Sequence, residues 1–366
     1  MRKRFNDTGL CIPGRHYMAD TSRKIEQILQ LVEEGKYFTI NRPRQFGKTT
    51  ILSLLAGKLN QDKDCTALRI SFEEIDMDTY QNQESFIRIF LDMFIREFDY
   101  LKLPDLSGFI EQQIDKVKNM PDLSRFITKL IRNMPGKQLV LMIDEVDKSS
   151  DNQLFLNFLG MLRNKYLQRN EGKDESFQSV ILAGVHDVKT LKAKIRPDDE
   201  RKYNSPWNIA ADFNIDMSFS PGEIGTMVQD YCNDRDIHAP VPAIAEKLYY
   251  YTSGYPYLVS KLCKFIDEQI IPGSEEKNWS VSDVDKAFQM IVKESYTTTL
   301  FDSLTKNLEN NPELYDTVFQ VIMNGRILKF TITDPVISFG HLYGILTESN
   351  GQCIIHNRIF EQRIYA

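Results

Sequence analysis

The sequence contains no uninterrupted apolar run of the roughly 18–20 residues that a membrane-spanning helix requires. Its start, MRKRFNDTGLCIPG, is basic but lacks the apolar stretch that follows the basic residues of a signal peptide. Positive charge is not in excess either, because 45 Lys and Arg stand against 51 Asp and Glu, for a net charge of -6. This balance excludes a general attraction to nucleic acid or an anionic membrane, so such a contact needs a local patch. These absences predict a cytoplasmic protein without a membrane partner.

Cysteine is scarce and scattered. The chain has 5 cysteines, an odd number, and they lie far apart at Cys11, Cys65, Cys232, Cys263 and Cys353. Such a set is neither a disulfide framework nor a zinc cluster with ligand spacing. We expect the cysteines to serve as small apolar or surface residues.

What the chain does have is an alternation of apolar strands and amphipathic helices. Residues 22–35 and 154–166 have helical spacing, and residues 84–134 form a longer helical region. Short apolar runs predict buried strands at 37–41, 66–72, 138–147 and 179–185. Strands that alternate with helices predict an α/β domain with a parallel sheet, which we place at residues 1–219.

The character of the sequence changes near Ser220. SPGEIG carries the signature of a helix N-terminus, and every segment from there to about Val292 has a helical pattern. From residue 298 onward the order is two helices, a short strand (KFTIT), a helix at 334–346 and a hairpin across residues 349–351. This order is that of a winged helix. The predicted domains are therefore 1–219, 220–297 (a helical domain) and 298–366 (a winged-helix-like domain), which agrees with a length of 366 residues.

The strongest motif is RPRQFGKTT at 42–50, between a predicted strand and a predicted helix. This is the context of the phosphate-binding motif G-x-x-x-x-G-K-[ST], in which backbone N–H groups at a helix N-terminus hold phosphate. Lys48 would place its charge between the β- and γ-phosphates, and the Thr49 hydroxyl would bind Mg²⁺. The candidate nucleotide-binding residues here are Arg44, Gln45, Phe46, Gly47, Lys48, Thr49 and Thr50.

One position departs from this motif, since Arg42 replaces its first glycine. That position normally makes a tight turn, so the loop is expected to close differently. Arg42 or Arg44 could also contact phosphate or a neighbouring subunit. The plain alternative for the whole motif is an ordinary Gly-Lys-Thr-Thr helix start without a nucleotide.

Carboxylates follow the most strand-like segment, LVLMIDEVD. Ligands of open α/β sheets bind beyond the carboxyl ends of the strands, where Asp144 is expected to lie. Asp144 is placed to hold Mg²⁺ through water, and Glu145 to act as the general base on the attacking water. Asp147 either assists them or only caps the next segment. The alternative is a strand that happens to end in acidic residues.

Three further groups are weaker candidates. His186 follows the strand 179–185 and could sense the γ-phosphate, although a loop histidine without this role fits equally well. Arg196 and Arg201 lie in a charged loop, and either could act as an arginine finger from a neighbouring protomer, whereas the alternative is a solvated loop. Arg163 is a weaker candidate for the same role.

Four segments together resemble predicted AAA-type ATPases of the STAND and archaeal-ATPase kind: PRQFGKTT, LVLMIDEVD, SPWNIA and SGYPYLVSKLC. The resemblance covers nearly the whole chain, from HYMADTSRKIE to NRIFEQRIY. It implies a P-loop NTPase fold of the AAA-like (ASCE) type, with a helical lid at 220–297, and hydrolysis of ATP with Mg²⁺.

The resemblance also assigns roles by position. HYMADTSRKIE occupies the place of a segment that embraces adenine, and Asp20 and Glu26 match its polar positions loosely. Gly254-Tyr255-Pro256 is similar to the Gly-x-Pro motif of the lid, which implies a contact between Pro256 and the base. Without the resemblance, these three residues would only mark a break between two helices. The Gly-Arg pair of the family is not found near residue 20.

DNA binding is not expected of the winged helix. Residues 298–366 contain five Lys and Arg and seven Asp and Glu, and the presumed recognition helix DPVISFGHLYGILTE contains no Lys or Arg. Since phosphate contacts dominate DNA affinity, this module is better suited to packing within the chain or to docking a protein partner.

Three functions follow as hypotheses. The first is an ATP-hydrolysing switch that couples nucleotide state to a protein partner or effector, with homo-oligomerisation left open. The second is a nucleotide-binding interaction module without catalysis, and the third a DNA-associated ATPase. ATP is favoured over GTP because the guanine-specific motif Asn-Lys-x-Asp is absent.

Overall fold

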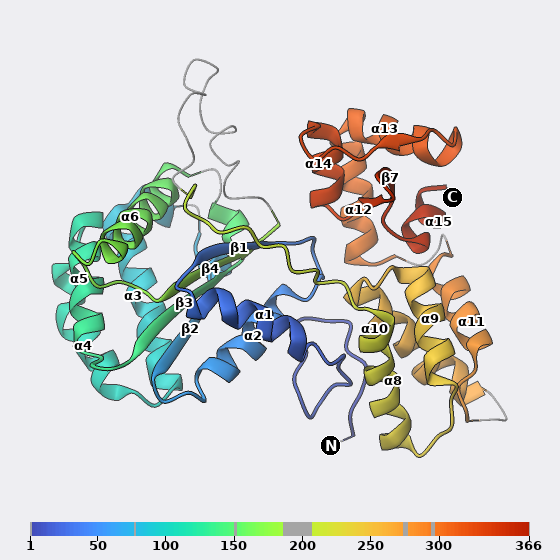
Figure 1. Ribbon diagram of the computed structural model, residues 1–366, viewed down its shortest axis with the longest axis horizontal. Coiled ribbons are helices and arrows are strands. Elements are labelled where there is room, and N and C mark those ends of the chain that lie inside the picture. The colour runs from blue at the N-terminus through green and yellow to red at the C-terminus, as the bar shows by residue number, and fades with distance from the viewer. Residues whose placement is uncertain are drawn as a thin grey trace. The chain divides into compact units, whose positions relative to one another are not determined.

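The computed structural model describes residues 2–76, 78–149, 152–185, 207–273, 277–293 and 297–365 (Figure 1). The chain forms two compact units that do not follow its order. The first, which we call the sheet unit, contains Ile25–Asn41 and Ile51–Ile215. The second, which we call the lid–wing unit, contains Met1–Lys24, Arg42–Thr50 and Asp216–Ala366. The predicted domain limits at 219 and 297 remain predictions.

The sheet unit contains a four-stranded parallel sheet in the order β1-β4-β3-β2. The strands are β1 (Tyr37–Asn41), β2 (Cys65–Ser71), β3 (Gln138–Asp144) and β4 (Ser179–Gly184). All four predicted strands are confirmed, although β3 ends three residues earlier than expected. Beyond β1, Ala211 forms a parallel bridge with Phe38, and its N–H donates to the Tyr37 carbonyl at 2.8 Å. The chain therefore returns along the outer edge of β1.

The helices around the sheet also agree with the predicted pattern. The region 84–134 resolves into three helices, each with its own start signal. These three are α3 (Gln83–Tyr100), α4 (Pro104–Gln113) and α5 (Met120–Arg132). Asn82 caps α3, a proline begins α4, and Asn119 caps α5.

The other helices around the sheet are α1 (Ser22–Glu33), α2 (Lys48–Leu59) and α6 (Gln153–Asn170), and Asn152 caps α6. Short 3-10 turns are η1 (Phe72–Glu74), η2 (Thr79–Gln81), η3 (Ile114–Lys116) and η4 (Val146–Ser149).

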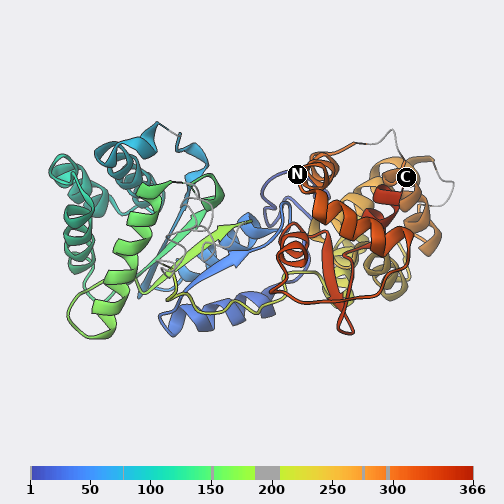
Figure 2. The same cartoon turned by 90° about the horizontal axis from the view of Figure 1, so that it is seen from above.

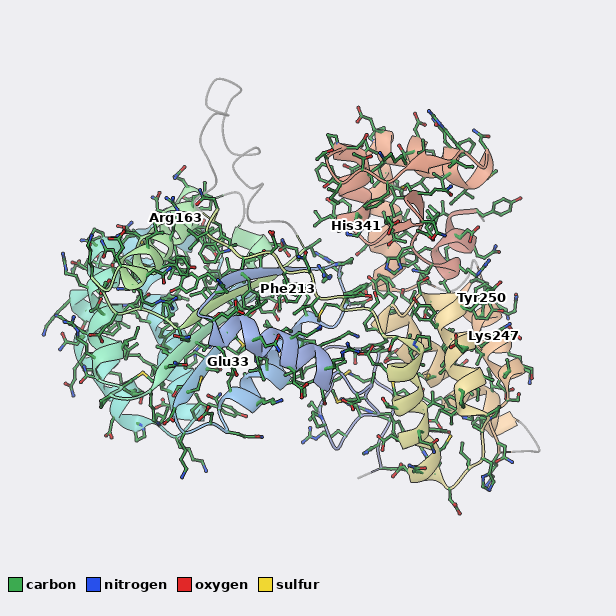
Figure 3. All side chains as sticks on the ribbon, in the orientation of Figure 1. Glu33, Arg163, Phe213, Lys247, Tyr250 and His341 are labelled. Atoms are coloured by element: carbon green, nitrogen blue, oxygen red, sulfur yellow. The ribbon has the colours of Figure 1, made fainter. Side chains whose placement is uncertain are left out.

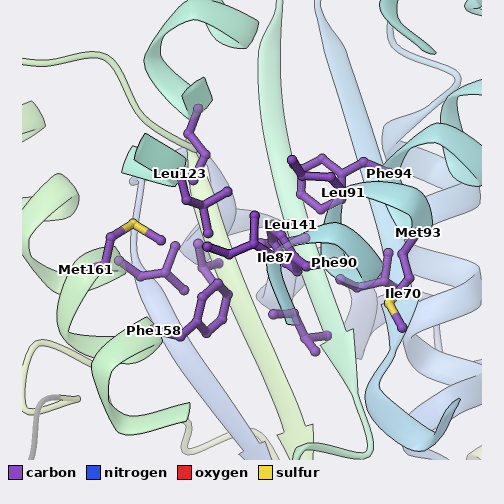
Figure 4. Close-up of a cluster of buried hydrophobic side chains, with 14 of the residues drawn as sticks. Ile70, Ile87, Phe90, Leu91, Met93, Phe94, Leu123, Leu141, Phe158 and Met161 are labelled. Atoms are coloured by element: carbon purple, nitrogen blue, oxygen red, sulfur yellow. The ribbon is translucent and has the colours of Figure 1, made fainter. Parts of the chain in front are cut away.

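Both faces of the sheet are covered. Alternate residues of β3, namely Leu139, Leu141 and Ile143, join a buried cluster with side chains of α3, α5 and α6 (Figure 4). Their neighbours Val140 and Met142 point to the opposite face and are also fully buried, since successive strand residues alternate in direction. Helices α1 and α2 lie on that face (Figures 1 and 2). A strand buried on both faces must be apolar throughout, which explains the continuous apolar run of β3.

The first half of the lid–wing unit is helical, as predicted. We call residues 216–293 the lid helices: α8 (Pro221–Arg235), α9 (Val241–Thr252), α10 (Pro256–Phe265), η7 (Ile266–Ile270), η8 (Ile271–Gly273) and α11 (Val281–Ile291). The predicted start signal is a complete capping box, because Ser220 and Glu223 each accept a hydrogen bond from the other's backbone N–H.

The N-terminal segment, by which we mean residues 2–24, packs on these lid helices. Phe5 and Tyr17 join Tyr231 and Trp279 in an aromatic cluster with ring centroids 4.6–5.8 Å apart. The Asp7 carboxylate accepts hydrogen bonds from Lys261 and Lys264 at 2.6 and 2.7 Å. Residues 2–24 are therefore part of the lid–wing unit.

The C-terminal residues have the element order of a winged helix. The elements are α12 (Thr299–Glu309), α13 (Pro312–Met323), β5 (Leu328–Lys329), α14 (Pro335–Leu342), β6 (Leu346–Ser349), β7 (Gln352–Ile355) and α15 (Arg358–Tyr365). The strands form an antiparallel sheet in the order β5-β7-β6. The guanidinium of Arg358 on α15 lies 4.1 Å from the ring centroid of Tyr250 on α9, so this module packs directly on the lid helices. Tyr250 is labelled in Figure 3.

The turn between α9 and α10 depends on Gly254. Its φ is +73°, and a Cβ at this position would lie 2.1 Å from the Phe219 carbonyl oxygen. Gly254→Ala is therefore expected to lower the free energy of unfolding by at least about 2 kcal/mol, because both strain and a backbone clash oppose the methyl group. Thermal or urea unfolding measures this loss.

The matched control is Gly222→Ala in α8. The nearest atom to a Cβ there is the Ser220 hydroxyl oxygen at 3.9 Å, and φ is not positive. Alanine is the better helix former, so this variant should be as stable as the wild type or slightly more stable. Equal stability of both alanine variants would contradict the role assigned to Gly254.

Among the described residues, no helix combines the length and apolar character needed to cross a bilayer.

Candidate functional site

The carboxyl ends of β1, β3 and β4 lie along one edge of the sheet in the sheet unit. Asn41 pairs with Gly184, and Ile143, the residue before Asp144, pairs with Leu182. Asp144 is only 3% exposed, and one of its carboxylate oxygens accepts a hydrogen bond from the Glu145 N–H at 3.0 Å. Ligands of open α/β sheets bind beyond the carboxyl ends of the strands, and the buried carboxylate of Asp144 lies at this edge.

The chain turns sharply directly after Asp144. Glu145 has a φ of +55°, the left-handed region that costs an ordinary residue about 1–2 kcal/mol. Such strain often occurs at functional sites, where the surrounding structure maintains it. The turn takes Glu145 out of the strand direction and leaves its side chain half-buried.

Asp147 has a structural contact. Its carboxylate accepts a hydrogen bond from the Val185 N–H at 2.6 Å and lies so close to Gly184 that a Cβ there would be 2.7 Å away. It therefore joins η4 to the end of β4. This contact is with the end of β4 and not with the segment that follows Asp147, so the two roles that the sequence left open for Asp147 stay predictions.

The candidate phosphate loop belongs to the lid–wing unit. Strand β1 ends at Asn41 and helix α2 begins at Lys48, so residues 42–47 form the whole connection. Gln45 and Gly47 have φ values of +58° and +82°, and nothing lies within 4 Å of a Cβ added to Gly47. The loop thus has open space at Gly47, directly before a helix N-terminus, and backbone N–H groups at such a terminus bind anionic phosphate.

Arg42 does not disturb this loop. It is not among the residues with positive φ, so the position of the motif's first glycine needs no glycine here. Burial lowers the pKa of the Arg42 guanidinium, while the charge of Asp216 raises it. The left-handed residues of this loop are Gln45 and Gly47, and a closure that differs from that of the usual motif stays a prediction.

Lys48 lies against the start of its own loop. Its ammonium group donates to the carbonyls of Arg42 at 2.9 Å and Pro43 at 3.0 Å, and the residue is 7% exposed. These bonds satisfy a charge that is costly to bury alone. They also hold the ammonium group against the backbone of the candidate phosphate loop.

Residues 43–46 pack against both the lid helices and the winged helix. The Tyr255 hydroxyl donates to the Arg44 carbonyl at 2.5 Å, and Phe46 meets the Tyr255 ring edge-on at 4.7 Å. His356, between β7 and α15, has its ring 6.0 Å from that of Phe46, and burial lowers its pKa to about 4, so it is neutral. Sequence reasoning missed these contacts because no spacing pattern connects residues so far apart in the chain.

Two of the loop residues have exposed side chains. Arg44 and Gln45 are exposed, and the Gln45 amide donates to the Thr299 hydroxyl at 3.1 Å at the start of α12. Thr49 and Thr50 are half-buried, and the Thr50 hydroxyl accepts a hydrogen bond from the Cys11 N–H at 3.2 Å. The N-terminal segment therefore reaches the beginning of α2.

Pro256 is the first residue of α10, a position that suits its fixed φ and missing N–H. Ser253 and Gly254 before it both have positive φ, so they close the preceding helix. This geometry accounts for the break between the two helices. A contact between Pro256 and the base stays a prediction.

Of the weaker candidates, only Arg163 lies among the residues that the structure describes. His186, Arg196 and Arg201 lie outside the described residues, and their roles stay predictions. Arg163 lies on α6 in the sheet unit (Figure 3), and its Nε is buried without a hydrogen-bond partner among the described residues.

The donor chemistry fits Mg²⁺. Thr49 offers a hydroxyl and Asp144 a carboxylate, both hard oxygen donors of the kind that this ion prefers. Within the described ranges, no group of three or more His, Cys, Asp or Glu could hold a metal. A site with few protein ligands is usual for Mg²⁺, which keeps several waters and binds phosphate oxygens.

A parallel sheet with a Gly-Lys-Thr loop after β1 and a buried Asp at the end of β3 defines a P-loop nucleotide triphosphatase fold. The sequence matches the model of the AAA-like domain family over residues 12–363, nearly its whole length. The chain belongs to this family and is a P-loop ATPase. Proteins of this family typically use ATP and Mg²⁺. The assignment does not extend to the STAND group, which stays a prediction.

One solved structure supports this fold, and two others are only weaker similarities. The Walker-type ATPase PABY2304 of Pyrococcus abyssi is 10% identical, with a TM-score of 0.61 over 100% of this chain and 99% of that one. The ORC2 protein of Aeropyrum pernix, in ADPNP-ADP complexes, is 11% identical with a TM-score of 0.47, over 99% and 98%. The RuvB Holliday junction branch migration motor of Thermotoga maritima is 14% identical with a TM-score of 0.43, over 92% of each chain. No protein of curated function has a significant match to the sequence.

Proposed function

We propose that this chain is a Mg²⁺-dependent ATP switch, in which the phosphate loop passes its nucleotide state to the lid helices and the winged helix. One observation carries the proposal. Residues 43–46 contact Tyr255 of the lid and His356 of the winged helix within one compact unit. Phosphate that reorganises this loop must therefore change contacts in both modules, which is how a ligand biases one conformation over another.

The residue roles in this proposal follow the motif. Backbone N–H groups of residues 44–49 and the Lys48 ammonium group hold the phosphates. Thr49 and Asp144 hold Mg²⁺, and the ion neutralises charge on the phosphate oxygens. Glu145 accepts a proton from the attacking water, and His186 senses the γ-phosphate. Pro256 contacts the base.

The proposed recipient of the signal is a protein partner or effector rather than DNA. The winged-helix residues carry more acidic than basic side chains, and the observed helix α14 contains no Lys or Arg. Little of the phosphate contact that dominates DNA affinity is available from such a helix. A cytoplasmic location and the choice of ATP over other nucleotides belong to the same proposal.

Hydrogen exchange with and without nucleotide tests the switch. Amides of residues 340–346 and 353–357 are expected to exchange at different rates with a Mg²⁺-bound, non-hydrolysable ATP analogue and with Mg²⁺-ADP. The reason is that both segments lie against the phosphate loop, which the γ-phosphate reaches directly. Helices α4 and α5, which lie in the sheet unit, serve as the internal control.

If these two segments exchange hydrogen at the same rate in both nucleotide states, at verified saturation, the chain is an ATPase but the proposed switch is wrong. A steady-state phosphate assay distinguishes an ATPase from a module that binds the nucleotide without hydrolysing it. Nucleotide binding with phosphate release no faster than background would favour the non-catalytic interaction module.

A further inference from the structure

Tyr255 belongs to the lid helices and contacts the phosphate loop through both its hydroxyl and its ring. It is the residue before α10, it is fully buried, and its hydroxyl reaches the backbone carbonyl of Arg44 at 2.5 Å. Its ring contacts three others edge-on, those of Phe46 at 4.7 Å, His356 at 5.6 Å and Phe360 at 5.6 Å. Rings on several sides fix the direction of the hydroxyl.

The hydrogen bond to Arg44 controls the orientation of a peptide in the loop. The carbonyl of Arg44 and the N–H of Gln45 belong to one planar trans peptide unit, in which they point in opposite directions. Holding the carbonyl toward the lid therefore turns the Gln45 N–H away from the lid. Backbone N–H groups are what such a loop offers to phosphate.

The loop needs this support because of its own sequence. Gln45 adopts a φ of +58°, which a side-chain-bearing residue takes only at a cost. External contacts must then maintain the curvature of the loop.

A second contact comes from the winged helix. Gly344, with a φ of +69°, approaches Pro43 so closely that a Cβ would lie 2.6 Å from the Pro43 ring. The same hypothetical Cβ would lie 3.5 Å from the Tyr255 ring. Pro43 and Arg44 are thus held from outside at successive positions.

We propose that Tyr255 is a positioning residue of the nucleotide site, whose hydroxyl sets the Arg44–Gln45 peptide so that the loop presents its N–H groups to phosphate. The inference rests on the proposed function and adds a residue to it. Burial raises the pKa of the Tyr255 phenol above its ordinary value, so the donor stays protonated at physiological pH.

Tyr255→Phe tests this role, since it removes the hydroxyl and keeps the ring contacts. The Kd for Mg²⁺-ATP by calorimetry and the KM for ATP are each expected to rise about tenfold, because the Arg44 carbonyl loses its partner and the loop relaxes. The kcat at saturating ATP should change by less than about twofold, since nothing at the reacting atoms is altered.

Tyr231→Phe is the matched control. Tyr231 is also a buried lid tyrosine, at 2% exposure, and its hydroxyl donates to the Asp267 carboxylate at 2.7 Å, away from the loop. Both variants should melt at similar temperatures, and only Tyr255→Phe should weaken ATP binding.

The outcomes are distinguishable. Unchanged ATP affinity of Tyr255→Phe beside a wild type that binds ATP overturns the positioning role alone. An unfolded variant, or one destabilised far more than Tyr231→Phe, identifies a structural residue and also overturns it. A wild-type chain that does not bind Mg²⁺-ATP refutes the proposed function, and the positioning role with it.

Discussion

Replacing Lys48 with alanine is expected to weaken Mg²⁺-ATP binding by about 100-fold. The ammonium group supplies charge-assisted hydrogen bonds to phosphate, which contribute up to about 3 kcal/mol, and each 1.4 kcal/mol is a factor of ten in affinity. Isothermal titration calorimetry with Mg²⁺ present measures the loss directly. The structure adds one expectation, a lower melting temperature, because the Arg42 and Pro43 carbonyls also lose their donor.

Lys58→Ala is the control for this experiment. Lys58 is exposed in the last turn of the same helix α2, so its loss changes the net charge equally without touching the loop. Its affinity for ATP should equal that of the wild type. If Lys48→Ala binds ATP as tightly as Lys58→Ala, residues 42–50 are an ordinary helix start and the proposed site is wrong.

Replacing Glu145 with glutamine is expected to preserve ATP binding and to slow turnover by about 100- to 1,000-fold. Glutamine keeps the size and hydrogen-bonding capacity of the side chain but cannot accept the proton of the attacking water, and general bases typically contribute factors of this order. The left-handed turn at residue 145 should persist, because the substitution leaves the backbone and Cβ unchanged. Steady-state phosphate release and calorimetry together separate turnover from binding.

Glu171→Gln provides the comparison for Glu145→Gln. Glu171 is an exposed carboxylate at the end of α6 in the sheet unit, and its neutralisation should leave turnover unchanged. A Glu145→Gln protein that hydrolyses ATP at the wild-type rate would remove Glu145 from the role of base. Another group would then have to activate the water.

Much of the fold could be predicted from local pattern. The strand at 37–41 agrees with its expected range, and the helix that begins at Ser22 agrees to within two residues, because apolar spacing and cap residues act over a few positions. The longer region 84–134 was predicted as helical but not divided, since Pro104 and Asn119 were not used as separate start signals. The C-terminal order of helices and strands was predicted correctly for the same local reasons, but two ranges were wrong. The strand β5 covers Leu328–Lys329 and not KFTIT, and α14 ends at Leu342 and not at residue 346.

The division into units was not predictable in this way. The two compact units alternate along the chain, since residues up to Lys24 and the loop Arg42–Thr50 belong with the C-terminal modules. The contacts responsible join residues far apart, as between Lys24 and Glu223 at 2.5 Å. Such pairs leave no periodic signal in the chain.

The sequence by itself determined the class of this protein, because a phosphate loop and an acidic strand end are short segments whose chemistry depends on neighbouring residues. The tertiary structure alone decided what holds that loop. Tyr255 and Arg44 lie 211 positions apart, and only the path of the folded chain brings the hydroxyl to the carbonyl. Local hydrogen bonding and apolar spacing encode helices and strands, whereas a contact between distant residues exists only once the elements have packed together.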